Sequence, residues 1–252
     1  MPTRLDPLTL LAAALVVGGG VGLARQRAAE QADPLPCDPL DLTCEVDPGY
    51  AAAVADARSA SAPRLTAEEA CVNAGYLCSE LARAARIRLQ RWKAIDGPLV
   101  VHVPRPAFEG GIDPVALQQA AVLGVRAWNN QPFPILVDTR GDRDPHFAIS
   151  WKGTLDGMQI GVARTQWSPE TGLSVVSIEL AMRNPYDPAR MNDPMQVRLT
   201  AAHEMGHALG LGHSDSARDV MYPTNTASAV SARDRRTMEV LYEMADGTEI
   251  SR

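Results

Sequence analysis

Three histidines and one glutamate stand at fixed intervals within eleven consecutive residues, and their spacing constrains the backbone. His203 and His207 are four residues apart, so on a helix their imidazoles lie about 40° apart and face one point in space. Glu204 is rotated about 100° from His203, which places its carboxylate beside that point. His213 can return to the same point only if the chain turns sharply at Gly210. The segment therefore predicts a helix that ends near Gly210.

This spacing predicts a catalytic zinc site. Three neutral imidazoles leave a fourth coordination position for water or substrate, which is typical of catalytic rather than structural zinc. Uncharged ligands leave the metal able to lower the pKa of water and to polarise a carbonyl group. Glu204 is placed to take a proton from that water and to deliver it to a leaving amine. With five histidines in 252 residues, the motif would arise by chance in roughly one chain in 10⁵.

Two other interpretations of the motif are open. The histidines could be incidental on an amphipathic core helix, or the zinc site could be purely structural. A structural site gives Glu204 no task, and no fourth protein ligand stands near His213. The sequence therefore favours a zinc-dependent hydrolase of peptide bonds. The alternative is a catalytically silent, zinc-stabilised extracellular binding module.

The N-terminus predicts export. Residues 8–24 carry no charge and are flanked by Arg4, Arg25 and Arg27. Seventeen residues are short for a membrane span, and three consecutive glycines weaken a helix. Residues 1–24 are interpreted as a cleaved signal peptide, with an N-terminal membrane anchor or a buried core helix as alternatives. We therefore expect a protein that is secreted or tethered to the cell surface.

The four cysteines all lie near the N-terminus, in two pairs with the same spacing. Cys37 and Cys44 are separated by six residues, and so are Cys71 and Cys78. Neither pair has the two-residue gap of a zinc ribbon or a redox motif. In an exported chain an even count predicts two disulfides, with Cys37–Cys44 and Cys71–Cys78 as the most local pairing. Four free buried thiols are the alternative.

Residues 25–97 are expected to form a linker and a helical segment that holds these cysteines. Prolines interrupt the first part, whereas Thr66–Glu69 has a capping-box pattern and Gly75 could end the helix that it starts. The segment could also be a removed, inhibitory pro-segment. A second helix is predicted over residues 77–92, with a solvated basic face or, alternatively, a basic partner or lipid surface. Its apolar residues recur at helical spacing: Leu77, Leu81, Ala85, Leu89 and Trp92.

After Gly97 the sequence alternates between short apolar runs and helical stretches, which predicts an α/β or mixed α+β domain. Asp113–Pro114 and Asp193–Pro194 each combine an N-cap residue with a first-turn proline and so predict two helix starts. The first of these helices is expected to face inward through Val115, Ala116, Ala120, Leu123, Ala127 and Trp128. Strands are predicted at 99–103, 135–137, 146–151, 160–165 and 174–180.

The chain resembles the metzincin zinc metalloproteases, most closely the matrixin-like group. The long zinc motif is followed by Ser214 and by Asp219–Pro223, which is similar to the Met-turn of that family. Residues 231–242 are similar to its C-terminal helix. The resemblance covers residues 98–244. It implies a zincin-like fold with a twisted, mostly parallel sheet and three main helices. It makes residues 98–246 the catalytic domain, preceded by the small helical segment with the cysteines, and residues 247–252 a tail.

The same resemblance implies the roles of individual residues. It makes Glu204 the general base and acid and places Met221 beneath the site, while Gly210 allows the turn. It also implies that residues 160–165 form an edge strand on which a peptide substrate lies antiparallel. The segment 224–230 would border the pocket for the side chain after the cut. The zinc ligands would be His203, His207 and His213.

Departures from the family pattern limit what else is expected. Only His102 and His146 remain for a second zinc site, so that site is expected to be absent. The cysteine-switch signature is missing, although a cysteine thiolate could still block the zinc. The acidic stretch 138–144 could bind calcium but lacks a recognisable loop pattern, which favours a solvated turn. With 24 basic against 30 acidic residues, no nucleic-acid partner is expected, and the predicted partners are protein or peptide substrates. The oligomeric state is not predicted.

Overall fold

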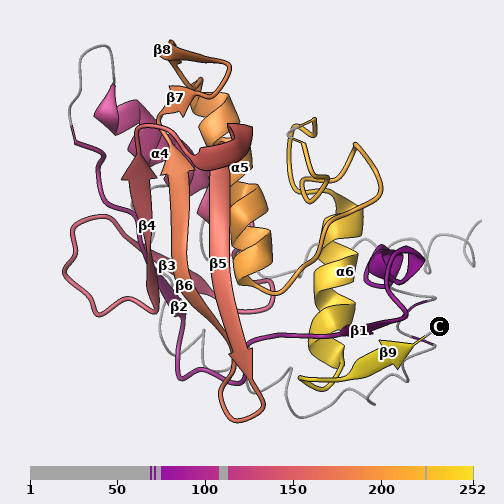
Figure 1. Cartoon of the computed structure of the whole chain (residues 1–252). Coiled ribbons are helices and arrows are strands. Elements are labelled where there is room, and N and C mark those ends of the chain that lie inside the picture. Colours follow the sequence, from indigo (N-terminus) through magenta and orange to yellow (C-terminus); the bar gives the residue numbers. More distant parts are fainter. Residues whose placement is uncertain (1–68, 70, 72–74, 108–112, 225, 252) are drawn as a thin grey trace, which may run out of the picture. The chain divides into compact units, whose positions relative to one another are not determined.

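The computed structural model describes residues 69, 71, 75–107, 113–224 and 226–251 (Figure 1). The predicted signal peptide or anchor, the proline-rich linker and the pair Cys37 and Cys44 lie outside the described residues. Among the described residues, no helix has both the length and the apolar character needed to cross a membrane.

A five-stranded sheet forms the centre of the described fold, in the order β3-β2-β4-β6-β5 (Figure 1). The first four strands pair in parallel, whereas β5 pairs antiparallel with β6 and lies at the edge of the sheet. The mostly parallel sheet and the edge position of β5 are therefore confirmed. The strands are β2 (Leu99–His102), β3 (Ile135–Asp138), β4 (Phe147–Lys152), β5 (Gly161–Ser168) and β6 (Gly172–Ala181).

Within the described part of the chain, three main helices accompany the sheet, as predicted: α4 (Pro114–Arg126), α5 (Pro194–Ala208) and α6 (Ala232–Glu243). Both predicted aspartate caps are present. Asp113 accepts hydrogen bonds from two backbone N–H groups of the first turn of α4, and Asp193 accepts one from the first turn of α5. Ser231 starts α6 with a reciprocal capping box. The two aspartate-capped starts depend on local sequence, which is why they could be predicted, whereas the helix over residues 231–242 was expected from the family resemblance.

The inward face of α4 differs from the predicted one. Ala120 and Trp128 are buried as expected, but Val115 is 39% exposed. The close approach of α4 to α5 decides which face is buried, because a Cβ at Gly124 would lie only 2.4 Å from the carbonyl oxygen of Arg198. The contact is therefore centred on Gly124, and the neighbouring buried residues of α4 include Leu117, Ala121 and Val125.

The predicted second helix over residues 77–92 is wrong. This segment forms a short 3-10 helix, η1 (Ser79–Ala82), and a strand, β1 (Arg86–Arg88). Strand β1 pairs antiparallel with β9 (Glu249–Ser251), in the part of the chain expected to be a tail. Trp92 then forms a β-bridge with Gly172. Pairing with two distant parts of the chain overrides the local helical spacing, so no basic helix face exists.

Residues 75–95 share one hydrophobic core with the rest of the described chain. Tyr76, Leu89 and Trp92 are all less than 8% exposed and belong to the same buried cluster as the sheet and helices. The indole Nε1 of Trp92 donates to the carbonyl oxygen of Ala208 at the end of α5 (2.7 Å). The hydrophobic core is therefore continuous across the domain boundary that was expected after Gly97.

Two smaller features complete the described fold. The predicted disulfide between Cys71 and Cys78 is present. A hairpin of β7 (Arg183–Asn184) and β8 (Asp187–Met191) leads into α5, and a 3-10 turn, η2 (Asp156–Met158), precedes β5. Neither the hairpin nor this turn was predicted from the sequence.

Candidate active site

Helix α5 and the turn after it bring the three predicted histidines together. His207 Nε2 lies 3.1 Å from His203 Nε2 and 3.2 Å from His213 Nε2. Nitrogen ligands at 2.0–2.1 Å around a tetrahedral ion are separated by roughly 3.3 Å, so these positions fit a zinc ion. Among the described residues, this triad is the group of potential ligands that is close enough together to hold a metal ion.

Gly210 makes the turn in the predicted way. Its φ is +101°, a conformation that side-chain-bearing residues rarely adopt. A Cβ there would also lie 2.2 Å from the carbonyl oxygen of Gln90, in the segment that was wrongly predicted as a helix. Any other residue at 210 would therefore strain the turn and displace the segment that packs behind the site.

Backbone carbonyls orient two of the rings. His203 Nδ1 lies 2.7 Å from the oxygen of Val220, and His207 Nδ1 lies 2.8 Å from the oxygen of Leu211. A carbonyl oxygen only accepts, so each Nδ1 carries the proton and leaves the Nε2 lone pair free for a metal. Burial lowers the pKa of His203, and burial together with the neighbouring His203 lowers the pKa of His207 to about 3. The rings are therefore held in the neutral form that binds metal.

The side chain of Glu204, a residue of α5, lies between that helix and β5. Its side chain is buried, and burial raises its pKa to about 7, against a hydrogen bond from the backbone N–H of Ala163 that lowers it. Strand β5 passes so close that a Cβ at Gly161 would lie 2.8 Å from Glu204 Oε1. A carboxyl group with a pKa near neutrality can both accept and release a proton.

Met221 lies where the Met-turn interpretation expects it. It is fully buried, and a Cβ at Gly206 would lie only 2.2 Å from its sulfur atom. Gly206 belongs to the same turn of α5 as the first two histidines, so the methionine packs directly against the helix that carries them. The backbone carbonyl of Met221 accepts a hydrogen bond from the N–H of Ser214, which links this turn to the residue after His213 (2.8 Å).

Residues 131–243 match the matrixin peptidase family. The match supports a matrixin-like metzincin catalytic domain in this part of the chain. The matched segment runs from the loop before β3 to the last residue of α6, and it contains all three histidines, Glu204 and Met221. The match supports a zinc metalloendopeptidase as the general class of the domain. Residues 75–130, which include Tyr76, Trp92 and α4, lie outside the match.

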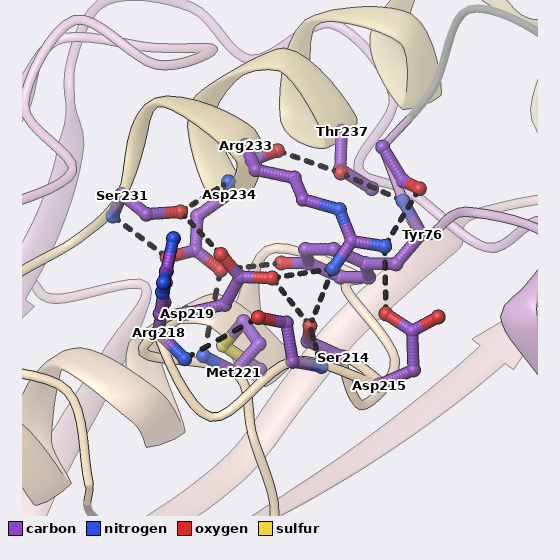
Figure 2. Close-up of polar contacts among 12 residues, drawn as sticks. Tyr76, Ser214, Asp215, Arg218, Asp219, Met221, Ser231, Arg233, Asp234 and Thr237 are labelled. Carbon is purple, nitrogen blue, oxygen red and sulfur yellow. Dashed lines mark hydrogen bonds and ion pairs between the residues drawn. The ribbon is translucent and has the colours of Figure 1, made fainter.

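A buried polar network supports the Met-turn of the matrixin-like domain, and the sequence analysis did not find it (Figure 2). Asp234, fully buried on α6, accepts hydrogen bonds from Val220 N (2.9 Å) and Tyr76 Oη (2.8 Å). The oxygen of Val220 in turn orients His203. Tyr76 is thus connected to the first histidine through Asp234. The sequence signals this network only through the Ser231–Asp234 capping pattern, which marks the start of α6 but does not reveal the contacts with Val220 and Tyr76.

Asp219 belongs to the same polar network, and its contribution to the free energy of unfolding is expected to depend on pH. Burial would raise its pKa, but hydrogen bonds from Ser214, Ser231 and Arg233 outweigh burial and hold it below 3.8. Because the folded-state pKa is lowered, the stabilisation is fully present above the unfolded value of about 3.9 and is lost as pH falls through the folded pKa. We expect Asp219→Asn to lower the free energy of unfolding by about 1–3 kcal/mol at pH 7.

Urea unfolding at pH 7 and at pH 3 measures this effect. The difference between wild type and Asp219→Asn should shrink at pH 3, because this pH lies below the unfolded-state pKa of about 3.9 and proton uptake by Asp219 then favours the unfolded chain. Asp215→Asn is the matched control, because Asp215 also pairs with Arg233 but its side chain is 64% exposed. A loss of stability that is the same at both pH values would contradict the assignment.

The remaining candidate ligands make local contacts. His102 Nδ1 lies 3.0 Å from the backbone carbonyl oxygen of Asp138 on β3, and it donates to this oxygen because a carbonyl group can only accept. His146 Nδ1 accepts from Val100 N. Asp138 caps the next turn by accepting from the backbone N–H groups of Arg140, Gly141 and Arg143. Ala229 and Val230, at the C-terminal end of the segment 224–230, line a cavity of about 150 Å³ together with Leu199 and Ala202 of α5.

Proposed function

We propose that this protein is a zinc-dependent endopeptidase that cleaves protein substrates, with Glu204 as general base and acid. One observation carries the proposal: three Nε2 atoms converge, the Nδ1 protons of His203 and His207 are directed to backbone carbonyls, and a buried carboxyl group lies beside them. A zinc ion held by His203, His207 and His213 supplies the Lewis acid that polarises the scissile carbonyl and acidifies a water molecule.

The residues of the chain perform the proton transfers. Glu204 accepts the proton of the attacking water and later passes it to the amine that leaves. Its raised pKa suits both steps, because the group gains and loses a proton near neutral pH. The buried position between α5 and β5 keeps the carboxyl group beside the histidines rather than in bulk solvent.

Strand β5 is the proposed support for the substrate. Among the described strands it pairs with β6 alone, so its other edge is the proposed binding surface for an extended peptide. Ala163, whose N–H reaches Glu204, marks the point along β5 that is closest to the proposed base. A peptide that pairs antiparallel with β5 would place its scissile bond at this point. The side chain after the cut would enter the region bordered by the segment 224–230.

We also infer that the chain is exported. The uncharged run over residues 8–24 supports this inference, and so does the disulfide between Cys71 and Cys78, since disulfides persist mainly outside the cytosol.

Metal removal tests the proposed activity. We expect the purified protein to contain about one zinc ion per chain, to cleave casein, and to lose cleavage after treatment with a chelator. Added zinc should restore it. Cleavage that survives complete removal of metal would contradict the mechanism. A zinc-loaded protein that leaves both casein and a diverse peptide library intact would instead indicate the silent binding module.

A further inference from the structure

A cavity of about 350 Å³ adjoins the histidine triad, and two different parts of the chain form its walls. One wall comes from the matrixin-like domain and includes His207, His213 and Thr165. The opposite wall comes from η1, β1 and the residues around them, which lie outside the matched segment 131–243. The second wall is thus an addition of this chain to the catalytic domain.

The direction of β5 indicates which part of a substrate would reach this cavity. Ala163 lies beside Glu204, and the cavity is lined by Ala163 and extends along β5 to Thr165, two residues further on. A peptide antiparallel to β5 runs the opposite way, so its residues before the scissile bond lie opposite the Thr165 end. Two residues of a strand span about 7 Å. The cavity is therefore suited to a side chain roughly two residues before the scissile bond.

Glu80 gives the cavity its charge. It is an exposed residue of η1, and no ion pair or hydrogen bond of its carboxylate occurs within the described part of the chain. The carboxylate lies against the residue before the third histidine, since a Cβ at Gly212 would lie 2.5 Å from Glu80 Oε1. The absence of a side chain at 212 is what leaves room for it.

The other charged residue of the cavity wall is engaged elsewhere. Arg88 forms an ion pair with Glu249 and lies over the ring of Trp167, 5.1 Å from its centre. The rest of the outer wall is largely apolar, with Leu77, Ile87 and Leu89. An apolar wall beside a single carboxylate matches a long basic side chain, whose methylene groups pack while the charged end reaches the acid.

We propose that this cavity is a substrate subsite for a lysine or arginine about two residues before the scissile bond, with Glu80 as the specificity-determining residue. The proposal rests on the proposed endopeptidase function and adds a substrate preference to it. It also gives the segment 76–90 a role in the mature enzyme, because this segment forms the wall that carries Glu80.

Matched peptides test the subsite. A diverse peptide library first identifies a cleaved sequence, which is then made with lysine, glutamine or glutamate at each of the three positions before the cut. We expect wild-type kcat/KM to be about 3- to 10-fold higher for lysine than for glutamine at one of these positions. Glu80→Gln should remove this preference, and Glu80→Lys should favour glutamate instead.

Glu239→Gln is the control variant, because Glu239 is an exposed glutamate of α6 that does not line the cavity. It should keep the wild-type preference. Wild-type preference retained in Glu80→Lys, or no preference in a wild-type enzyme that cleaves, would overturn the subsite while leaving the endopeptidase function intact. A zinc-loaded wild type that cleaves no library peptide would overturn the proposed function and the subsite with it. Circular dichroism of each variant checks that the fold is retained.

Discussion

Replacing Glu204 with alanine is expected to lower kcat/KM for casein-derived peptides by roughly 10²–10⁴-fold while zinc stays bound. The three imidazoles supply the ligands, so the metal content should match that of the wild type. The fold should also survive. The carboxyl group is buried with one backbone N–H as its polar partner, and its removal leaves no buried charge unpaired.

Three measurements on the same preparation decide this prediction: zinc content, the midpoint of thermal unfolding, and the rate of cleavage. Glu204→Gln keeps the shape of the side chain but cannot take up a proton, so its activity should fall to a similar level. Glu239→Gln should remain fully active. Equal cleavage of casein by wild type and Glu204→Ala would exclude Glu204 as the base and would end the assignment.

A chain that begins at Pro98 is expected to lose at least about 3–5 kcal/mol of folding free energy. This is the typical cost of removing one large aromatic residue from a core, and the truncation removes Trp92, Leu89 and Tyr76 together. It also removes β1, the strand with which β9 pairs. The hydrogen bond that the Tyr76 hydroxyl donates to Asp234 is lost as well. The matrixin-like domain should therefore be unstable without the segment before it.

Chemical unfolding of the two chains measures this loss, and Trp92→Ala in the full chain tests its largest single part. Lys93→Ala is the control, because Lys93 is exposed and its Nζ donates to the backbone carbonyls of Pro169 and Glu170. We therefore propose that any removed pro-segment ends before Cys71. Mass spectrometry of the secreted protein should find that the mature N-terminus lies before Cys71. A mature N-terminus near Gly97, or equal stability of the two chains, would contradict this prediction.

Predictions from the sequence succeeded where a few neighbouring residues determine the structure. The aspartate caps of α4 and α5 bond to N–H groups two or three residues away, so the sequence alone places both helix starts. The alternation of apolar residues predicted the five strands of the sheet within a few positions. Family resemblance supplied the parallel pairing and the edge position of β5, which spacing alone does not establish.

Predictions failed where a distant partner decides the conformation. Leu89 and Trp92 recur at helical spacing, yet β9 and Gly172 pair with this segment and hold it extended. Val115 has the apolar character of a core residue, but the contact of α4 with α5 turns it outward. Pairing and close packing across long chain separations leave no local pattern, so such errors are expected.

The sequence by itself determined the candidate metal site: three histidines and one glutamate, spaced along one helix and the glycine turn after it, are enough to make three imidazoles converge beside a carboxyl group. Only the tertiary structure decided what surrounds that centre. It placed Tyr76 and Asp234 behind the Met-turn and Glu80 in the wall beside His213. The physical reason is the range of the interactions. Two of the proposed ligands are related by the pitch of one helix and the third by the turn that follows it, whereas the supporting residues meet only when segments far apart in the chain pack into one core.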